Sequence, residues 1–311
     1  MKSIHCVGIV VVDLLNGPIK EYPVPRSVPQ ITAEWTRVMP GGGAANTSSA
    51  IARMGISVAA FSKVGADLNG EFIRREMEKV GVDTSGFPVS KTESTPFTFV
   101  GIHADGERTF IHTPGANLSF TIGDLDLDRV LAADFLLYHD LWVLPAFDGK
   151  PAATLLAQAQ KRGVTTFLDE GFGYGPKREL LETMLPYCDH FTPSYDDLKS
   201  IYPGLSPDAL AEELLVRGAK SVVLKLGREG CLVVRGSERH RVPVCSAQVV
   251  DTTGAGDCWN AGFMAALAHG EDILRAARVG NACAAFGIEA VGGSTGVPKY
   301  EEVCRRANLI A

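Results

Sequence analysis

The sequence lacks the motifs that mark several large protein classes. Its 311 residues contain no Gly-x-x-x-x-Gly-Lys-Ser/Thr of P-loop proteins, and no predicted strand is followed by the Gly-x-Gly-x-x-Gly of dinucleotide-binding domains. Its 7 histidines show no His-Glu-x-x-His or other metal-ligand spacing. These absences argue against the P-loop class, against the dinucleotide-binding fold and against a histidine-ligated metal site.

Cysteine pairs, basic runs and long apolar runs are also missing. The 7 cysteines are scattered without a Cys-x-x-Cys pair, which is typical of reduced thiols in a cytosol. There are 30 basic and 36 acidic residues, with no long basic run, so we expect neither nucleic acid nor a membrane as a partner. No apolar stretch is long enough to span a bilayer, and residues 4–15 predict a strand rather than a signal peptide. We therefore expect a cytoplasmic protein.

The sequence does contain a regular alternation of strand-like and helix-like segments. Apolar runs predict strands at 4–12, 57–64, 135–138, 164–168, 190–192 and 221–226. Helices are predicted at 152–162, 177–184 and 207–217, and two largely apolar helices are predicted at 257–269 and 271–288. This order predicts an α/β fold with a doubly wound, mostly parallel sheet. No linker or repeat interrupts it, so we expect residues 1–311 to form a single domain.

Two segments do not fit this alternation. Residues 14–39 are rich in proline and alternate loosely, and residues 95–113 predict two strands joined by an Asp-Gly turn at 104–107. Together they predict a small sheet beside the main domain, which serves either as a lid over a pocket or as a plain edge extension. The exposed edges of such a sheet often pair with another copy, so we expect a homodimer through the lid.

The most informative stretch is Asp-Thr-Thr-Gly-Ala-Gly-Asp at residues 251–257, followed by an apolar helix. A glycine-rich turn that leads into a helix N-terminus binds anions, because free backbone N–H groups and the positive end of the helix dipole face the ligand. Asp257 lies in the first turn of this helix. It either caps the helix or acts as a general base that takes a hydroxyl proton during phosphoryl transfer.

A second glycine-rich turn, Pro-Gly-Gly-Gly-Ala-Ala-Asn at residues 40–46, opens an earlier helix. Either a ligand approaches its backbone closely, with Asn46 facing the same pocket as Asp13 at a strand end, or the glycines form a flexible hinge. Arg108 on the lid points inward at a polar substrate or is solvated. His139 and Asp140 lie at a strand end, where they either contact a substrate or form part of the interior; a satisfied interior histidine is the favoured interpretation.

The two glycine motifs together resemble the paired signatures of the ribokinase-like (PfkB-type) carbohydrate kinases. The resemblance covers essentially the whole chain, since Gly-Ala-Asn at residues 115–117 and the turn at residues 225–230 also follow in the family's order. The motif at residues 251–257 is highly specific, and the motif at residues 40–46 is moderately so. The family resemblance implies ATP-dependent phosphorylation of a hydroxyl group on a sugar or sugar acid, with Mg²⁺ and possible dependence on K⁺.

The resemblance also implies roles for individual residues. Asp257 would be the catalytic base, and the anion hole would be formed by the backbone of Gly254, Ala255 and Gly256. The substrate would be held by Asp13, Gly41, Gly42, Asn46 and Asn117, with Arg108 as a further candidate. The nucleotide would lie against Ser194, Lys225, Gly227, Gly230 and Asn281. Asp197 would reach Mg²⁺ through water, and Asp251 and Thr253 would form a monovalent-cation site.

Two departures from the family pattern leave alternatives open. The family often carries Asn-x-x-Glu where this chain has Ser194 and Asp197, and Asp169 is followed by Glu170 instead of the residues that many sugar kinases show. A non-catalytic sugar or nucleoside binder would explain these losses, although the intact Asp257 argues against it. A nucleoside kinase would need a stacking surface, for which the candidates are Trp35, Phe97, Phe99 and Phe110. A sugar or sugar-acid kinase is the favoured prediction.

Overall fold

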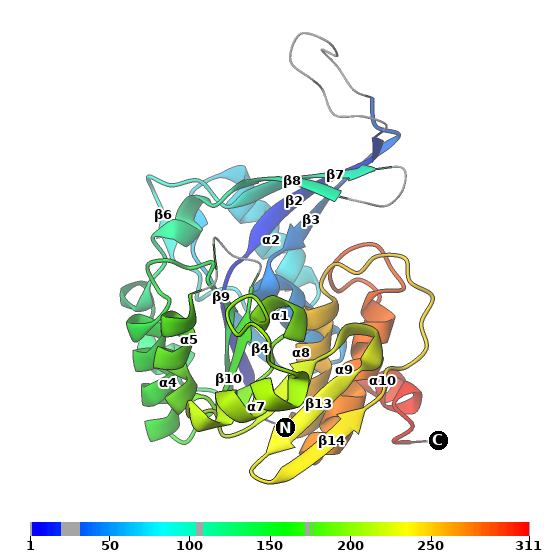
Figure 1. Cartoon of the computed structure of the whole chain (residues 1–311). Coiled ribbons are helices and arrows are strands. Elements are labelled where there is room, and N and C mark those ends of the chain that lie inside the picture. The colour runs from blue at the N-terminus through cyan, green and yellow to red at the C-terminus, as the bar shows by residue number, and fades with distance from the viewer. Residues whose placement is uncertain (1, 20–31, 104–107, 172–174, 176, 311) are drawn as a thin grey trace.

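The main body is built around one large, mostly parallel sheet (Figure 1). The computed structural model describes residues 2–19, 32–103, 108–171, 175 and 177–310. The strand order is β14 (Glu238–Val242), β13 (Cys231–Arg235), β12 (Val222–Lys225), β11 (His190–Phe191), β10 (Thr165–Glu170), β9 (Phe135–Leu141), β1 (Ile4–Val7) and β4 (Val58–Phe61). Neighbouring strands are parallel from β4 to β12, and β13 and β14 are antiparallel. The predicted α/β class and doubly wound sheet are confirmed.

Helices cover both faces of this sheet because successive strand residues point to opposite sides. In β9, Phe135 and Leu137 join one core cluster, whereas Leu136 and Tyr138 join the other. The first cluster includes residues of α1 (Gly43–Arg53), α2 (Leu68–Lys79), α8 (Ala255–Ala268), α9 (Ile273–Gly287) and α10 (Tyr300–Arg306). The second includes residues of α3 (Leu127–Val130), α4 (Lys150–Lys161), α5 (Arg178–Met184), α6 (Tyr195–Leu198) and α7 (Pro207–Val216).

A second, four-stranded sheet projects from one end of the main body (Figure 1). Its order is β3 (Trp35–Gly41), β2 (Val11–Ile19), β7 (Phe97–His103) and β8 (Arg108–Thr113). The predicted lid sheet is therefore present, although residues 20–31 and the predicted turn at 104–107 lie outside the described residues. A short pair, β5 (Val64–Gly65) and β6 (Val89–Ser90), forms a third sheet. Single-turn helices occur at Gly115–Leu118 (η1), Ile122–Asp124 (η2), Leu185–Tyr187 (η3) and Gly227–Glu229 (η4).

The prediction of one continuous strand over residues 4–12 was wrong. The chain leaves the main sheet after Val7 and enters the lid sheet at Val11. Between them, Gly8 packs so closely on Asp140 that a Cβ there would lie 2.7 Å from Asp140 Oδ2, and the Ile9 N–H donates to the same oxygen at 2.9 Å. Asp13 consequently lies inside lid strand β2, opposite Met39 and Thr98, and not at the end of a main-sheet strand.

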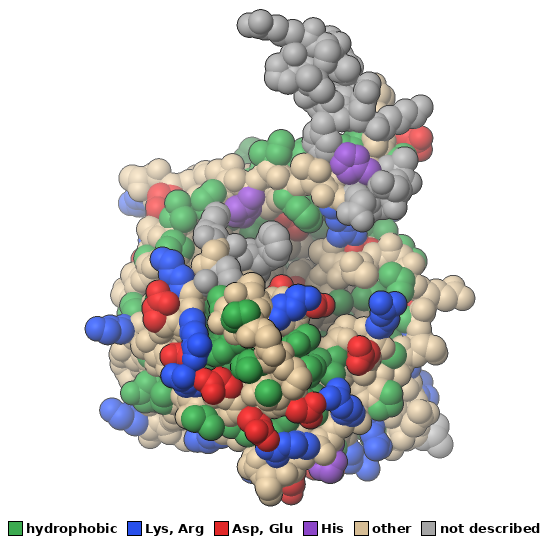
Figure 2. All heavy atoms as spheres, viewed as in Figure 1, with side chains coloured by type: hydrophobic (Ala, Val, Ile, Leu, Met, Phe, Trp, Pro, Cys, Tyr) green, Lys and Arg blue, Asp and Glu red, His purple; other side chains and the backbone are tan. Residues whose placement is uncertain are grey.

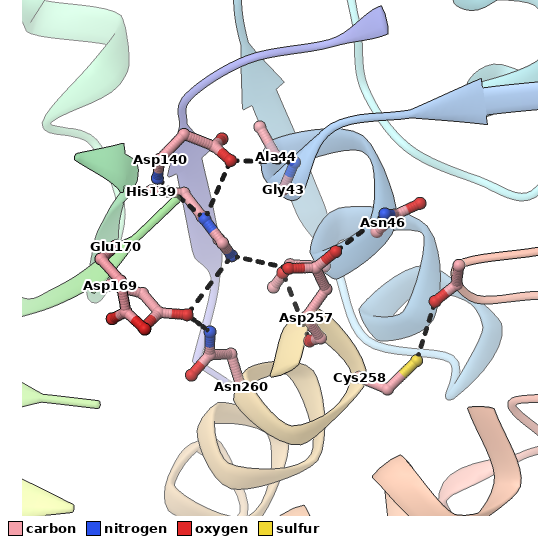
Figure 3. Close-up of polar contacts among 12 residues, drawn as sticks. Gly43, Ala44, Asn46, His139, Asp140, Asp169, Glu170, Asp257, Cys258 and Asn260 are labelled. Atoms are coloured by element: carbon pink, nitrogen blue, oxygen red, sulfur yellow. Dashed lines mark hydrogen bonds and ion pairs between the residues drawn. The ribbon is translucent and has the colours of Figure 1, made fainter. Parts of the chain in front are cut away.

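This arrangement gathers the polar ends of several elements in one place. The carboxyl ends of β9 and β10 and the N-termini of α1 and α8 meet at the edge of the sheet on the side of the lid (Figures 1 and 3). Lys225 at the end of β12 reaches the same edge, because its Nζ lies 2.8 Å from Asp169 of β10. In open α/β sheets this edge is where ligands bind. Among the described residues, no helix combines the length and apolar character needed to cross a bilayer.

Candidate active site

The N-terminus of α8 forms a tight, glycine-dependent turn. Gly254 precedes the helix with φ of 69°, and a Cβ at this position would lie 2.4 Å from the Gly293 carbonyl oxygen, so only glycine fits here. The Ala255 N–H already donates to the Thr252 carbonyl at 3.2 Å. A Cβ on Gly256 would lie 3.2 Å from Lys225 Nζ, which brings an ammonium group to the first turn of the helix. The turn therefore combines a helix N-terminus with a positive charge, as an anion site requires.

Asp257 lies within this first turn, and its carboxylate is held from two sides (Figure 3). Asn46 Nδ2, from α1, donates to Oδ2 at 2.7 Å, and His139 Nε2, from β9, lies 3.2 Å from Oδ1. The Thr47 hydroxyl donates to the Asp257 backbone carbonyl at 3.3 Å. The side-chain hydrogen bond between Asn46 and Asp257 thus joins the two glycine motifs, which are more than 200 residues apart in the chain.

His139 was not predicted as part of the site. The sequence favoured a satisfied interior histidine, and the structure instead places this buried ring among the carboxylates of Asp140, Asp169 and Asp257. The residues next to His139 have the pattern of a buried strand, so they do not distinguish it from a histidine of the hydrophobic core. Its only signal in the sequence is its place at the carboxyl end of a predicted parallel strand, where ligands are expected.

A second buried charge cluster adjoins the base. Lys225 Nζ bonds both oxygens of Asp169, at 3.0 and 2.8 Å, and the Asn260 amide of α8 also donates to Asp169. Glu170, the next residue, accepts the Ser194 N–H at 2.7 Å, and its other oxygen has no hydrogen-bond partner among the described residues. Neither Asp169 nor Glu170 was predicted as a site residue; the sequence marked Glu170, after Asp169, only as a departure from the family pattern.

These charges compensate each other and set the ionisation of the base. Burial alone would raise the pKa of Asp257, but His139, Asn46 and Lys225 stabilise the carboxylate and keep its pKa below the usual value. Burial would lower the pKa of His139, but Asp140 and Asp257 together raise it well above its usual value. Asp257 is therefore held as a carboxylate in a buried environment, as a general base must be.

The first glycine motif, at residues 40–46, ends at Asn46, which lies on the side of Asp257 that faces away from His139. A Cβ on Gly41 would lie 2.0 Å from Asp13 Oδ2, so the Asp13 carboxylate packs directly on the backbone of this turn. Burial raises the pKa of Asp13 to about 7, although Thr98 and Arg108 act in the other direction. Gly42 has φ of 89°, and a Cβ there would lie 2.6 Å from the Ile9 carbonyl oxygen. Asp13, Gly41 and Gly42 therefore lie together, as the resemblance implied for a substrate pocket.

Two other predicted substrate residues lie differently. Arg108 forms an ion pair with Asp251 and so links lid strand β8 to the turn before α8. Asn117 is fully buried in η1, and neither end of its amide has a hydrogen-bond partner among the described residues. The structure joins Asn117 by no hydrogen bond to the cluster around Asp257.

The predicted monovalent-cation site is occupied by protein groups. Asp251 Oδ1 accepts the Thr253 N–H at 2.7 Å and bonds the Arg108 guanidinium, and Oδ2 accepts the Gly292 N–H at 3.0 Å. The pKa of Asp251 is lowered, since Arg108 and these N–H groups outweigh the effect of burial. A carboxylate already neutralised by a guanidinium does not fit a K⁺ ligand.

The predicted nucleotide residues fall into two groups. Ser194 forms an isolated parallel β-bridge with Lys225. The Leu226 N–H donates to the Gly230 carbonyl at 2.8 Å and so closes the turn that follows. Gly227 and Gly230 both have positive φ, and a Cβ on Gly230 would lie 2.0 Å from the Val242 carbonyl oxygen. Asn281 is engaged within the protein instead: its amide donates to the Val242 and Pro243 carbonyls at 3.1 and 2.8 Å and accepts from Trp259 at 2.8 Å.

Asp197 is exposed on α6, and no cluster of three or more potential metal ligands occurs among the described residues. The surface is hollowed between the lid sheet and the main body, and charges of both signs are interspersed on the face that Figure 2 shows.

Comparisons with known proteins decide the family. A model of the pfkB family carbohydrate kinases matches residues 1–300. The chain belongs to the pfkB family of carbohydrate kinases. An uncharacterized sugar kinase from Archaeoglobus fulgidus is 32% identical over 257 residues, which are 80% of this chain and 98% of the relative. A nucleoside kinase from Methanothermobacter thermautotrophicus is 28% identical over 306 residues, which are 98% of this chain and 95% of the relative.

The fold of this pfkB kinase agrees with solved members of the family. A ribokinase from Arabidopsis thaliana, solved in complex with ribose and ATP, is similar with a TM-score of 0.86 at 23% identity over 98% of both chains. The predicted resemblance, fold class and kinase activity are thereby confirmed. The chain is a sugar or nucleoside kinase.

Proposed function

We propose that this pfkB kinase transfers the γ-phosphoryl group of ATP to a hydroxyl group of a sugar or sugar acid, with Asp257 as the general base. The observation that supports the proposal best is the position of the Asp257 carboxylate. It lies in the first turn of α8, where Asn46 donates a hydrogen bond to one oxygen and His139 Nε2 lies 3.2 Å from the other. A carboxylate beside a helix N-terminus is poised to take a proton from a nucleophile that attacks an anion bound there.

The reaction would proceed by in-line displacement. The acceptor hydroxyl oxygen forms a bond to the γ-phosphorus, the bond between this phosphorus and the β–γ bridging oxygen breaks, and the hydroxyl proton passes to Asp257. The N-terminus of α8 and Lys225 would stabilise charge on the transferred group. The lid would exclude water and so favour the acceptor hydroxyl over hydrolysis.

Magnesium would enter with the nucleotide and neutralise charge on its phosphates. The residues present fit this ion, since Mg²⁺ in such sites needs only one or two carboxylates besides phosphate oxygens and water. Glu170 offers a buried carboxyl oxygen that has no hydrogen-bond partner among the described residues, next to Ser194, and Asp197 offers an exposed carboxylate on α6. Glu170 would thus stand in for the acid that the family carries in its Asn-x-x-Glu motif.

The acceptor pocket would be polar. Asp13 and Asn46 present a carboxylate and an amide on the two sides of the glycine turn, and such groups bind the hydroxyls of a sugar. The strand register places the lid aromatics on different faces of the sheet. Thr98 pairs with Asp13 and shares its face, whereas Phe97 and Phe99 point to the opposite face. These two rings therefore do not form a base-stacking surface beside Asp13.

A nucleoside acceptor is the second candidate because of Phe110. This residue pairs with Val100 in a register that places it on the same lid face as Thr98 and Asp13, and it is 56% exposed. Its ring is open to stack on a base, whereas Trp35 on the same face is covered by the Arg37 guanidinium at 5.4 Å from the ring centroid.

The two candidates are separated by measuring ADP release with Mg-ATP against ketoses, aldoses, aldonic acids, 2-keto-3-deoxy acids and nucleosides. The proposal expects turnover with a sugar or sugar acid and none with nucleosides. Turnover with a nucleoside that is lost in F110A would establish the second candidate instead. Tight acceptor binding without any turnover would show a non-catalytic binder.

A further inference from the structure

The His139 side chain is confined by its neighbours to one position. A Cβ on Gly43 would lie 2.3 Å from His139 Nδ1, and a Cβ on Gly8 would lie 2.9 Å from the Cβ of His139. Both positions therefore tolerate only glycine while this histidine is present. A ring that is 2% exposed and packed on two glycine backbones has little freedom to move, so its direction is a fixed property of the site.

The two nitrogens of this ring face different groups. Nδ1 lies 2.9 Å from the Asp140 backbone nitrogen, which donates to it, and 3.5 Å from Asp140 Oδ1. A neutral ring that accepts at Nδ1 carries its proton on Nε2, and a charged ring carries a proton there as well. Nε2 lies 3.2 Å from Asp257 Oδ1 and 3.8 Å from Asp169 Oδ2, without a well-aligned hydrogen bond among the described residues.

A buried N–H without an aligned acceptor is costly, so its retention between two carboxylates requires an explanation. Catalytic hydrogen bonds are often long or poorly aligned in a free enzyme and tighten when the substrate is bound. Figure 3 shows Nε2 directed into the space between Asp257 and Asp169, on the side of Asp257 opposite Asn46. The ring is thus placed to act on the base and not on the hydrophobic core.

We propose that His139 is a positioning residue for Asp257, whose Nε2–H fixes Oδ1 while Asn46 fixes Oδ2, so that the carboxylate stays aimed at the acceptor hydroxyl. This inference rests on the proposed role of Asp257 as the base. The pairing also keeps two buried carboxylates, Asp257 and Asp169, from repelling each other, because the imidazole lies between them.

The charges that face His139 come from every element around it. Asp140 lies on its own strand, Asp169 on β10 and Asp257 on α8, while Lys225 on β12 pairs with Asp169. Glu170 stands next to Asp169, and burial raises its pKa well above the usual value while no metal ion is bound. These carboxylates favour a protonated ring, whose Nδ1–H would face Asp140 Oδ1 at 3.5 Å and would no longer accept the Asp140 N–H. Loss of that cation would raise the pKa of Asp257.

The direct test compares H139Q and H139L with wild type across pH. Glutamine keeps an N–H donor without the charge, so we expect kcat to fall by about tenfold, and leucine should lower it by about 10². The KM for ATP should change by less than about threefold, because His139 holds the base and not the nucleotide. The acid limb of the kcat/KM profile should move to higher pH in both variants, since Asp257 loses a cation.

His190 provides the matched control. The His190 ring lies at the amino end of β11, stacks on Phe167 and shares a hydrogen bond with the Ser221 hydroxyl at 2.7 Å, so it interacts with groups other than the carboxylates around His139. H190Q should lower the melting temperature without moving the acid limb. The proposal is overturned if H139L keeps kcat within about threefold of wild type, or if its activity falls with stability while the acid limb stays in place.

A measurement without turnover separates this inference from the proposed function. NMR of ¹⁵N-labelled imidazoles, assigned by comparison with H139Q, gives the pKa of His139 in the free protein. D257N should lower this pKa by about one unit or more, and D189N, remote from the cluster, should leave it unchanged. If the wild type phosphorylates no acceptor, the proposed function fails while this coupling is still measured. An unchanged His139 pKa in D257N would refute the positioning role.

Discussion

At the scale of single residues, the site consists of buried charges that neutralise each other in pairs. Asp257 faces His139, and Asp169 faces Lys225, each within ion-pair distance. Removing one member of such a pair leaves the other charge buried and uncompensated, which costs several kcal/mol, on the order of 3–5. Substitutions here should therefore be judged by stability and activity together. Asp13 is the exception, since its pKa shift comes mainly from burial.

Asp13 should make stability fall as pH rises. Burial raises its pKa from 3.8 to about 7, so the folded protein binds a proton there that the unfolded chain has released between these values. This contribution is complete below about pH 4 and is lost as pH rises through 7. D13N removes this titration. The free energy of unfolding of D13N minus that of the wild type should therefore be larger at pH 8 than at pH 5.

Denaturant unfolding at the two pH values measures this difference. D189N is the control, because Asp189 has a lowered pKa and stays ionised in both states across this range, so its effect should be equal at both pH values. Equal stability changes for D13N at pH 5 and pH 8 would contradict the assignment.

At the scale of elements, the N-terminus of α8 depends on one backbone conformation. In G254A, an alanine at φ of 69° costs about 1–2 kcal/mol, and its Cβ would also collide with the Gly293 carbonyl 2.4 Å away. The turn must shift, so we expect kcat to fall by about tenfold or more. Gly163 is the matched control: its φ is 78° and nothing lies within 4 Å of an added Cβ. G163A should lose stability and keep its turnover, whereas full activity in G254A would disprove the anion-hole role.

Arg108 links lid strand β8 to the turn before α8 and should make the enzyme indifferent to K⁺. Its guanidinium already neutralises Asp251, so replacing KCl by choline chloride should change turnover by less than about twofold. In R108Q the carboxylate loses its cation, and K⁺ should then stimulate turnover. A strong K⁺ requirement in the wild type would show that Arg108 leaves Asp251 when the substrates bind.

The elements themselves show what the sequence reveals and what it hides. Strand β8 begins directly after the predicted turn at 104–107 and ends at Thr113, as its residue pattern predicted, because alternation and turn residues are local signals. The break between β1 and β2 was hidden, since residues 4–12 are apolar throughout and only the packing of Gly8 on Asp140 ends the strand. His139 and Asp169 were missed as site residues for a related reason. Their partners lie on other elements, and no local pattern records a contact made across the sheet.

At the scale of the whole molecule, the lid carries the features of an association surface. Its edge strands β3 and β8 expose Val38, Phe110 and Ile111, which are 47, 56 and 62% accessible. We expect two copies to pair through this sheet, as the sequence predicted. I111D should then convert the dimer to a monomer in sedimentation velocity. V216D, at a still more exposed apolar position on α7 (81% accessible), should leave the dimer intact, and a monomeric wild type would refute the prediction.

The central claim is that Asp257 takes the acceptor proton in an ATP-dependent kinase, and it is tested most directly by D257N. With the acceptor found in the panel, kcat for D257N should fall by about 10² or more, because the amide cannot accept the proton. Calorimetric binding of Mg-ATP and of the acceptor should change little, since asparagine retains the shape of aspartate. A D257N enzyme that turns over at a rate near that of the wild type would remove Asp257 from the reaction and contradict the mechanism.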